Sequence, residues 1–192
     1  MMTGLFFGSF NPIHTGHLIV ADYMRQQANM EEVWFIVSPH NPLKEKSELA
    51  EQQLRLKMVQ MAIEDNKYFK ASDIEFQLPL PSYTVNTLTE LNRRFPQKQF
   101  AVIMGSDNLI NIHLWRNYET ILNNYQLFIY RRGETEETTW KKYTGITFFD
   151  APFIKISSTE IRSLIAKKKS VRYLVPEVVS KYIRENKLYG SE

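Results

Sequence analysis

The chain contains no cysteine, which excludes disulfide bonds, thiol chemistry and zinc sites built on thiolates. No segment approaches the run of about 18 apolar residues that a membrane span requires. The opening string MMTGLFFGSFNP lacks a basic region followed by a small-residue cleavage site, so we expect no secretory signal peptide. With neither an export signal nor a disulfide, the expected location is the cytoplasm.

Charge of neither sign dominates the sequence. Its 24 Lys and Arg residues are balanced by 21 Asp and Glu residues, which leaves a formal net charge of +3. Such a mild excess permits an anionic ligand, but it indicates neither a nucleic acid nor a membrane as a partner. The sequence leaves the oligomeric state open, with a homo-oligomer as one possibility.

The 192 residues, of which 43% are hydrophobic, suffice for one domain with a substantial core, and we predict a single domain over 1–192. Short apolar runs alternate with segments of helical spacing, which favours an α/β fold: a Rossmann-like, doubly wound, mostly parallel sheet with helices on both faces. The predicted strands are 3–7, 33–38, 69–74, 100–105, 127–131 and 146–150. The predicted helices are 15–29, 49–64, 83–95, 158–168 and 176–186.

Unusual residues follow several of the predicted strands. Gly8–His17 follows the first strand, Pro39–Lys44 the second, and Gly105–Asp107 contains the end of the fourth. In open α/β sheets, ligands bind outside the carboxyl ends of the strands. The three segments therefore predict one shared binding site.

His14 and His17 are two of only four histidines, and they lie where the first helix should begin. If Asn11 or Thr15 caps that helix, the two imidazoles share one face and point to one spot. The positive end of the helix would favour neutral rings until an anion arrives. The structural alternative is that one histidine caps the helix and the other fills the core. A zinc site would need a further ligand.

Gly8 and Ser9 form a predicted turn ahead of these histidines. Their backbone amides, together with the helix N-terminus, would make an anion site. Gly16, between the histidines, would let a ligand approach the backbone closely.

The string ISSTEIR near the C-terminus has two readings. Ser157 and Glu160 have the spacing of a capping box, which would only start a helix. Ser158 and Thr159 would also offer hydroxyls and backbone amides at that helix start, where Arg162 could reach a polyphosphate.

These strings resemble two motifs of the nucleotidyltransferase superfamily. GSFNPIHTGHL resembles the signature G-x-F-x-P-x-H-x-G-H, and ISSTEIR resembles the I-S-S-T-x-I-R motif of its adenylyltransferases. The cytidylyltransferase pattern R-T-x-G-x-S-T and the synthetase loop K-M-S-K-S are absent. The resemblance implies that the histidines hold the α-phosphate of a nucleoside triphosphate. It also implies that C-terminal helices, about 157–188, close the triphosphate site.

Three strings in the middle of the sequence bear on the identity of the acceptor substrate. PSYTVNTL resembles the P-S-Y-T-x-D-T-L motif of bacterial nicotinate-nucleotide adenylyltransferases, with Asn86 in place of Asp. GSDNLINIHLWRNYETI resembles the G-x-D-x-L…W segment of that family. The string SPHNPLK resembles its P-P-H-K-type loop, with Leu43 where a histidine is common. The resemblance implies that Trp115 stacks on a pyridine ring and that amides near Thr84 and Arg116 receive its carboxylate.

The resulting site predictions fall into three groups. The catalytic residues are His14, His17, Lys44 and Arg162. The ATP-binding residues are Gly8, Ser9, Phe10, His17, Gly105, Asp107, Ser157, Ser158, Thr159 and Arg162. The residues for nicotinate mononucleotide are Asn41, Lys44, Tyr83, Thr84, Trp115 and Arg116. No protein side chain is expected to hold a metal, and Mg²⁺ is expected to arrive on the ATP phosphates.

The implied reaction transfers AMP from ATP to nicotinate mononucleotide, giving nicotinate adenine dinucleotide and pyrophosphate, without a covalent enzyme intermediate. Pantetheine phosphate or nicotinamide mononucleotide are alternative acceptors. From a different class, a non-catalytic nucleotide- or RNA-binding module would use the basic string AKKKSVRY, whose lysines are otherwise typical of a solvated helix end.

Overall fold

The computed structural model describes residues 2–40, 49–132 and 137–191. Six strands form one sheet in the order β3-β2-β1-β4-β5-β6, and every neighbouring pair is parallel. This arrangement confirms the predicted Rossmann-like α/β fold. The strands are β1 (Met2–Gly8), β2 (Glu32–Val37), β3 (Phe69–Ser72), β4 (Gln99–Gly105), β5 (Gln126–Tyr130) and β6 (Ile146–Phe149).

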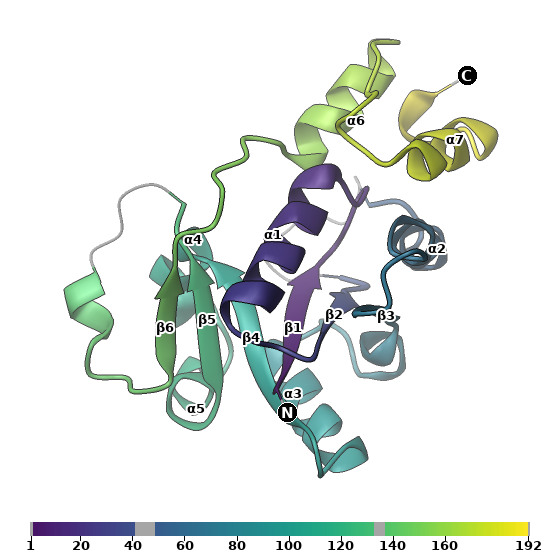
Figure 1. The fold of residues 1–192 in the computed structure, drawn as a ribbon. Coiled ribbons are helices and arrows are strands. Elements are labelled where there is room, and N and C mark those ends of the chain that lie inside the picture. Colours follow the sequence, from purple (N-terminus) through teal and green to yellow (C-terminus); the bar gives the residue numbers. More distant parts are fainter. Residues whose placement is uncertain (1, 41–48, 133–136, 192) are drawn as a thin grey trace.

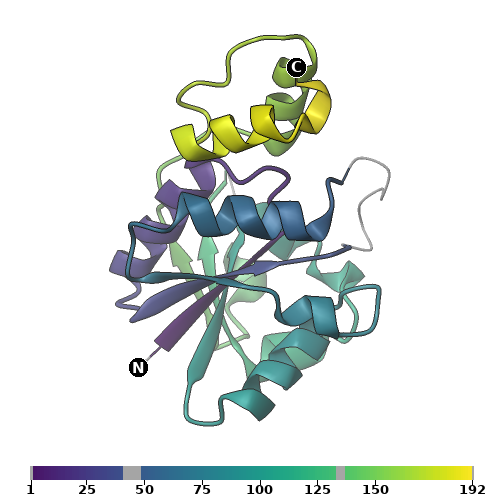
Figure 2. The same cartoon turned by 90° about the vertical axis from the view of Figure 1, so that its right-hand side faces the viewer.

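Helices cover both faces of the sheet (Figures 1 and 2). One face packs against α1 (Thr15–Gln27) and α2 (Gln52–Ala62), and the core on that side continues beyond the sheet to α6 (Ser158–Ala166) and α7 (Glu177–Glu185). The other packs against α3 (Thr84–Arg94), α4 (Ser106–Ile110) and α5 (Tyr118–Asn124). Short 3₁₀ turns complete the described part: η2 (Ile74–Gln77), η3 (Ile112–Leu114), η4 (Glu137–Trp140) and η5 (Leu188–Gly190). Within that part, no helix combines the length and the apolar character needed to cross a membrane.

The strands alternate their side chains between two hydrophobic cores. Phe6 and Ile103 belong to the core beneath α1 and α2, whereas Leu5 and Val102 belong to the core beneath α3 and α5. Because both faces are covered, the central strands are apolar at nearly every position, as parallel sheets usually are. This burial on both faces explains why the sequences of β1 and β4 are so strongly apolar.

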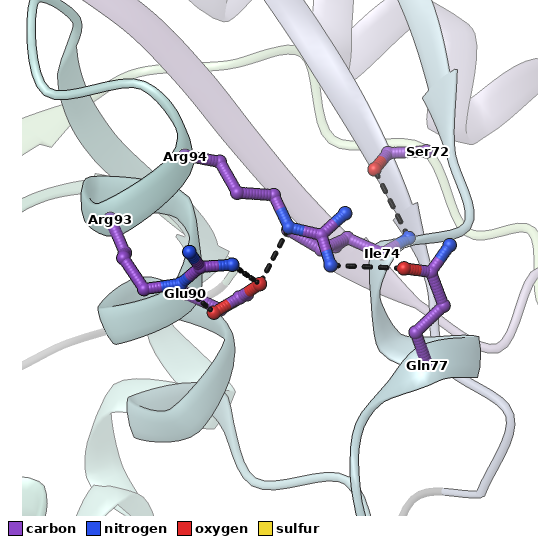
Figure 3. Close-up of polar contacts among 6 residues, drawn as sticks. All are labelled: Ser72, Ile74, Gln77, Glu90, Arg93 and Arg94. Atoms are coloured by element: carbon purple, nitrogen blue, oxygen red, sulfur yellow. Dashed lines mark hydrogen bonds and ion pairs between the residues drawn. The ribbon is translucent and has the colours of Figure 1, made fainter.

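The chain leaves the sheet earlier than predicted after the third strand. β3 ends at Ser72, whose Oγ accepts a hydrogen bond from the Ile74 backbone N–H, and the chain then turns into η2 (Figure 3). Arg94 on α3 contacts Glu90 on the same helix and also donates to Gln77 of η2 at 2.9 Å. The expected strand 69–74 was therefore too long by its last two residues.

The C-terminal helices lie at the carboxyl end of β1, beside the start of α1 (Figures 1 and 2). The backbone N–H of Thr15 donates to the carbonyl of Leu174 at 2.9 Å, and its hydroxyl donates to the carbonyl of Tyr173 at 3.1 Å. The segment between α6 and α7 is therefore hydrogen-bonded to the first turn of α1.

Candidate active site

A cavity of about 670 Å³ opens beyond the carboxyl ends of the central strands, where the sequence predicts the binding site. Side chains from the loop after β1, from α3, from the segment after β4 and from α6 share this one space. The predicted residues that line it are Gly8, Ser9, Phe10, His14, His17, Tyr83, Thr84, Asp107, Trp115, Arg116, Ser157, Ser158, Thr159 and Arg162.

Three predicted residues stand apart from that set. Asn41 and Lys44, like Leu43, lie outside the described residues. Gly105 ends β4 but does not line the cavity, where we expected it to leave room for the nucleotide. A side chain at that position would collide with the Asp107 carboxylate, so this glycine makes room for Asp107.

His14 is the N-cap of α1, so the alternative in which one histidine caps the helix is confirmed, and Asn11 and Thr15 are not the caps. Its Nδ1 accepts the backbone N–H of His17, and Nδ1 of His17 accepts the backbone N–H of His14, both at 3.3 Å. This is a capping box made by two imidazoles. The rings stack, with centroids 3.6 Å apart and planes 18° from parallel. Because each Nδ1 acts as an acceptor, each neutral ring has its proton on Nε2.

Burial first, and the nearby Arg132 second, lower the pKa of His14 to about 4. His14 is therefore neutral near pH 7, as predicted, although the main cause is burial and not the helix end we expected. Gly16 lies close to this ring, since a Cβ there would come within 3.1 Å of His14 Nδ1. The lack of a side chain at Gly16 therefore makes room for the His14 ring, whereas we expected it to let a ligand approach the backbone.

Arginines border the cavity next to this pair. Arg132 lies 3.4 Å from Asp107 (Nη1 to Oδ2). Arg162 donates to the backbone carbonyl of Asn11 at 3.0 Å. Arg131, whose position the sequence leaves open, instead pairs with carboxylates away from the cavity. The cavity thus has cationic groups near the histidines, which suits a polyphosphate.

The N-terminus of α6 faces the same space. Ser157 is its N-cap, with Oγ accepting the Glu160 backbone N–H at 3.1 Å. The capping interpretation is therefore right for Ser157. The hydroxyl of Ser158 donates to the carbonyl of Pro12 at 2.9 Å and so joins α6 to the histidine loop. Backbone amides of the first helical turn remain suited to an anion.

The opposite predicted subsite is built from α3 and η3. Tyr83 is the N-cap residue of α3 and Thr84 its first residue, so the SYT string does start a helix while it also lines the cavity. Trp115 is half-buried: it packs partly on the core and also lines the cavity. The Arg116 guanidinium lies over the Tyr83 ring, 4.9 Å from its centroid. A flat aromatic wall beside a helix N-terminus is suited to a ring that carries a carboxylate.

Glu75 is a buried site residue that the sequence analysis missed. It lines the cavity and is only 2% exposed. Its Oε1 accepts the Thr87 hydroxyl at 2.7 Å. Burial raises the pKa of Glu75, and this effect outweighs the hydrogen bonds from Thr87 and Ser38. Nothing in the string SDIEF distinguishes this glutamate from a surface residue.

Arg55 is the second residue that was missed. It is 1% exposed, and its four side-chain hydrogen bonds to described residues go to backbone carbonyls, those of Ser9, Ser38, Pro39 and Ala50. It thereby ties the loops after β1 and β2 to the start of α2. The sequence offered one indication that Arg55 is buried, because it lies beside the apolar residues Leu56 and Met58 of that helix.

The described residues offer no cluster of three or more His, Cys, Asp or Glu side chains that could hold a metal ion. Asp107 is a half-exposed carboxylate on the cavity wall. Mg²⁺ commonly binds through one or two carboxylates together with substrate phosphates and water. The cavity therefore fits Mg²⁺ that is carried mainly by a polyphosphate.

Comparison with known proteins agrees with this geometry. A family model described as cytidylyltransferase-like matches residues 5–164, which defines the class of the protein. A probable nicotinate-nucleotide adenylyltransferase of Flavobacterium johnsoniae is 48% identical over 191 residues, covering 98% of this chain and 99% of the relative. Another, of Cytophaga hutchinsonii, is 44% identical and is matched over 100% of both chains. The chain belongs to the nicotinate-nucleotide adenylyltransferase family.

Solved structures agree on the fold. Plasmodium falciparum nicotinic acid mononucleotide adenylyltransferase complexed with NaAD has a TM-score of 0.86 at 22% identity, covering 100% of this chain and 98% of that chain. A putative nicotinate-nucleotide adenylyltransferase of Vibrio parahaemolyticus has a TM-score of 0.72 at 18% identity, covering 100% of this chain and 96% of that chain.

Proposed function

We propose that this protein transfers AMP from ATP to nicotinate mononucleotide, releasing pyrophosphate and forming nicotinate adenine dinucleotide, a step toward NAD. The observation that carries the proposal is the reciprocal histidine cap, which puts His14 and His17 on the wall of one cavity with the α6 N-terminus and Trp115. The names of the relatives supply the same reaction class.

The chemistry requires alignment more than a base. An oxygen of the acceptor phosphate attacks the α-phosphorus of ATP, and the bond from that phosphorus to the bridging oxygen breaks as pyrophosphate leaves. A phosphate monoester has a second pKa of about 6, so the attacking group is already largely dianionic at neutral pH. The protein therefore has to hold the two phosphates in line and to stabilise charge in the transition state.

The histidine pair fits that task. Because each Nδ1 accepts a backbone N–H, both His14 and His17 would donate from Nε2–H to the oxygens of the α-phosphate. Donors fixed by the backbone need no rearrangement during the reaction. Backbone amides of Ser157–Thr159 and the Arg162 side chain would hold the remaining phosphates. Lys44, outside the described residues, keeps its predicted role at the acceptor phosphate.

Magnesium is the cofactor this proposal requires. Bound to the triphosphate, Mg²⁺ would offset the charge on the departing pyrophosphate. Asp107 is the carboxylate on the cavity wall that would meet it or its water ligands.

The acceptor is selected at the other end of the cavity. Trp115 would stack on the pyridine ring, an interaction worth about 1–3 kcal/mol per base in nucleic-acid systems. Amides near Thr84 and Arg116 would receive the carboxylate of nicotinate in preference to a neutral carboxamide. The charge of Arg116, held over Tyr83, would add to this preference.

We also propose that 1–192 acts as a single domain in which the C-terminal helices close the triphosphate site. ATP is supplied in the cytoplasm, which supports the location expected from the sequence. We propose no role for nucleic acid or a membrane, and homo-oligomer formation stays a prediction.

Pyrophosphate release with ATP and Mg²⁺ tests the proposal, with nicotinate mononucleotide, nicotinamide mononucleotide and phosphopantetheine compared side by side. A strong preference for the first is expected. Release with another acceptor would retain adenylyl transfer but contradict the assignment of Trp115 and Thr84. ATP binding without release for any acceptor would favour the binding-module alternative.

A further inference from the structure

Asn11 in the histidine loop is held by three distant parts of the chain. Its side-chain oxygen accepts the Tyr189 hydroxyl at 2.8 Å and the Ala50 backbone N–H at 3.1 Å. Its backbone carbonyl accepts Arg162 at 3.0 Å. Asn11 is itself only 3% exposed. The C-terminal end of the protein is therefore hydrogen-bonded directly to the loop that leads into His14.

Tyr189 reaches Asn11 from an unusual backbone conformation. Lys187 and Tyr189 have φ values of 51° and 58°, in the left-handed region that residues with side chains rarely adopt. Such conformations persist where the surrounding structure holds them, and they gather at functional sites. In Figure 2, α7 lies above the start of α1, and η5, which carries Tyr189, follows at the end of α7.

The loop is fixed from its other side as well. Arg55 donates to the carbonyl of Ser9 at 2.6 Å and to that of Ala50 at 2.8 Å. Ala50 in turn donates its N–H to Asn11. The segment between Ser9 and His14 is thus held between α2 and the C-terminus, and loss of either contact frees one side of it.

We propose that Tyr189 is a positioning residue for adenylyl transfer. Its hydroxyl fixes the Asn11 side chain, and this contact sets the position of the histidine loop relative to the α-phosphate. Tyr189 itself is not among the residues that line the cavity, so it acts through Asn11. This inference rests on the proposed function, and it extends the site to a residue close to the C-terminus.

The first test is Tyr189→Phe, which removes a single hydroxyl. Tyr125→Phe is the matched control, because its hydroxyl also takes part in a side-chain hydrogen bond, accepted from Asn92 Nδ2 at 3.2 Å, on the opposite face of the sheet. We expect kcat to fall about tenfold in Tyr189→Phe, since small displacements near reacting atoms lower rates strongly. The KM for nicotinate mononucleotide should stay within about twofold, because Trp115 and Thr84 are untouched. The control should match the wild type, and an unchanged kcat in Tyr189→Phe would overturn the proposal.

A double-mutant cycle with Asn11→Ala tests the route of the effect. If Tyr189 acts through Asn11, the double variant should be no slower than Asn11→Ala alone, whereas independent effects would multiply. Multiplying effects would overturn the proposal. If Tyr189→Phe folds poorly, Asn11→Ala alone tests the same contact from its other end, and an unchanged kcat in that variant would overturn the proposal.

The imidazole ¹⁵N signals of His14 provide a readout that needs no turnover. They should shift in Tyr189→Phe and not in Tyr125→Phe, and unchanged signals would count against the proposal. If the wild type released no pyrophosphate with nicotinate mononucleotide, the proposed function would fail while this spectroscopic test of the contact remained decisive.

Discussion

One guanidinium nitrogen of Arg55 donates to the carbonyls of both Ser9 and Ser38, so a buried cation joins the loops that follow two neighbouring strands. Both of these loops border the cavity. Arg55, which is 1% exposed, thus helps to fix the shape of the cavity wall.

Arg55→Met should therefore destabilise the protein by roughly 2–4 kcal/mol, because several buried carbonyls lose their donor together. Lys57→Met, at an exposed position of the same helix, should change stability by less than about 0.5 kcal/mol. Urea unfolding of both variants makes the comparison. Equal stability of the two would refute the role of Arg55.

The buried carboxyl of Glu75 should make stability depend on pH. Its pKa is raised in the folded protein, mainly by burial, so its contribution is complete at low pH and is lost as pH rises through the folded pKa. Glu75→Gln keeps the shape without the charge. The melting temperature of the variant should rise relative to that of the wild type as pH increases from 5 to 9. A difference independent of pH would show that Glu75 does not titrate in this way.

The carboxyl of Glu32, which lies far from the cavity, should make stability depend on pH in the opposite direction. Burial alone would raise its pKa, but hydrogen bonds from Lys70 and Lys98 outweigh it and hold the pKa at about 2. A lowered pKa gives stability that is present above the unfolded value of about 4.5 and is lost as pH falls toward 2. Glu32→Gln should cost roughly 2 kcal/mol at pH 7 and almost nothing near pH 2. Glu31→Gln, at an exposed neighbour, is the control, and parallel stability curves for the two would contradict the assignment.

Trp115→Ala tests the acceptor subsite. Loss of a stacking surface worth about 1–3 kcal/mol should raise the KM for nicotinate mononucleotide at least fivefold and leave the KM for ATP nearly unchanged. Trp140→Ala removes a tryptophan that does not line the cavity and should leave both constants unaffected. Equal changes in the two KM values would indicate that Trp115 only packs in the core and does not stack on the pyridine ring.

Much of this arrangement could be predicted from the sequence, because the signals were either strongly apolar or made of several fixed positions. β1 and β4 are buried on both faces, and the histidine loop has many characteristic residues in order. The helices α4 and α5 were missed, since five and seven residues are too short to establish helical spacing. A histidine cap was only the alternative to Asn11 or Thr15, because Ser, Thr, Asp and Asn are the usual capping residues.

Arg55 and Glu75 show a further limit of the sequence. A charged residue in a single sequence is expected at the surface, and only the tertiary structure shows that these two are enclosed by backbone carbonyls and hydroxyls. The sequence does not place Arg132 at the site for a related reason, because its contact with Asp107 depends on how the ends of β4 and β5 meet.

The proposed role of the paired histidines is to act on the transition state from fixed Nε2–H donors. Its most direct test is His17→Ala, measured as the single-turnover rate together with the Kd for ATP, with the exposed His113→Ala as control. Loss of one such donor should slow the chemical step about 100- to 1000-fold and change the Kd by only a few-fold. An unchanged rate with a correspondingly weaker Kd would contradict the account and make His17 a binding residue only.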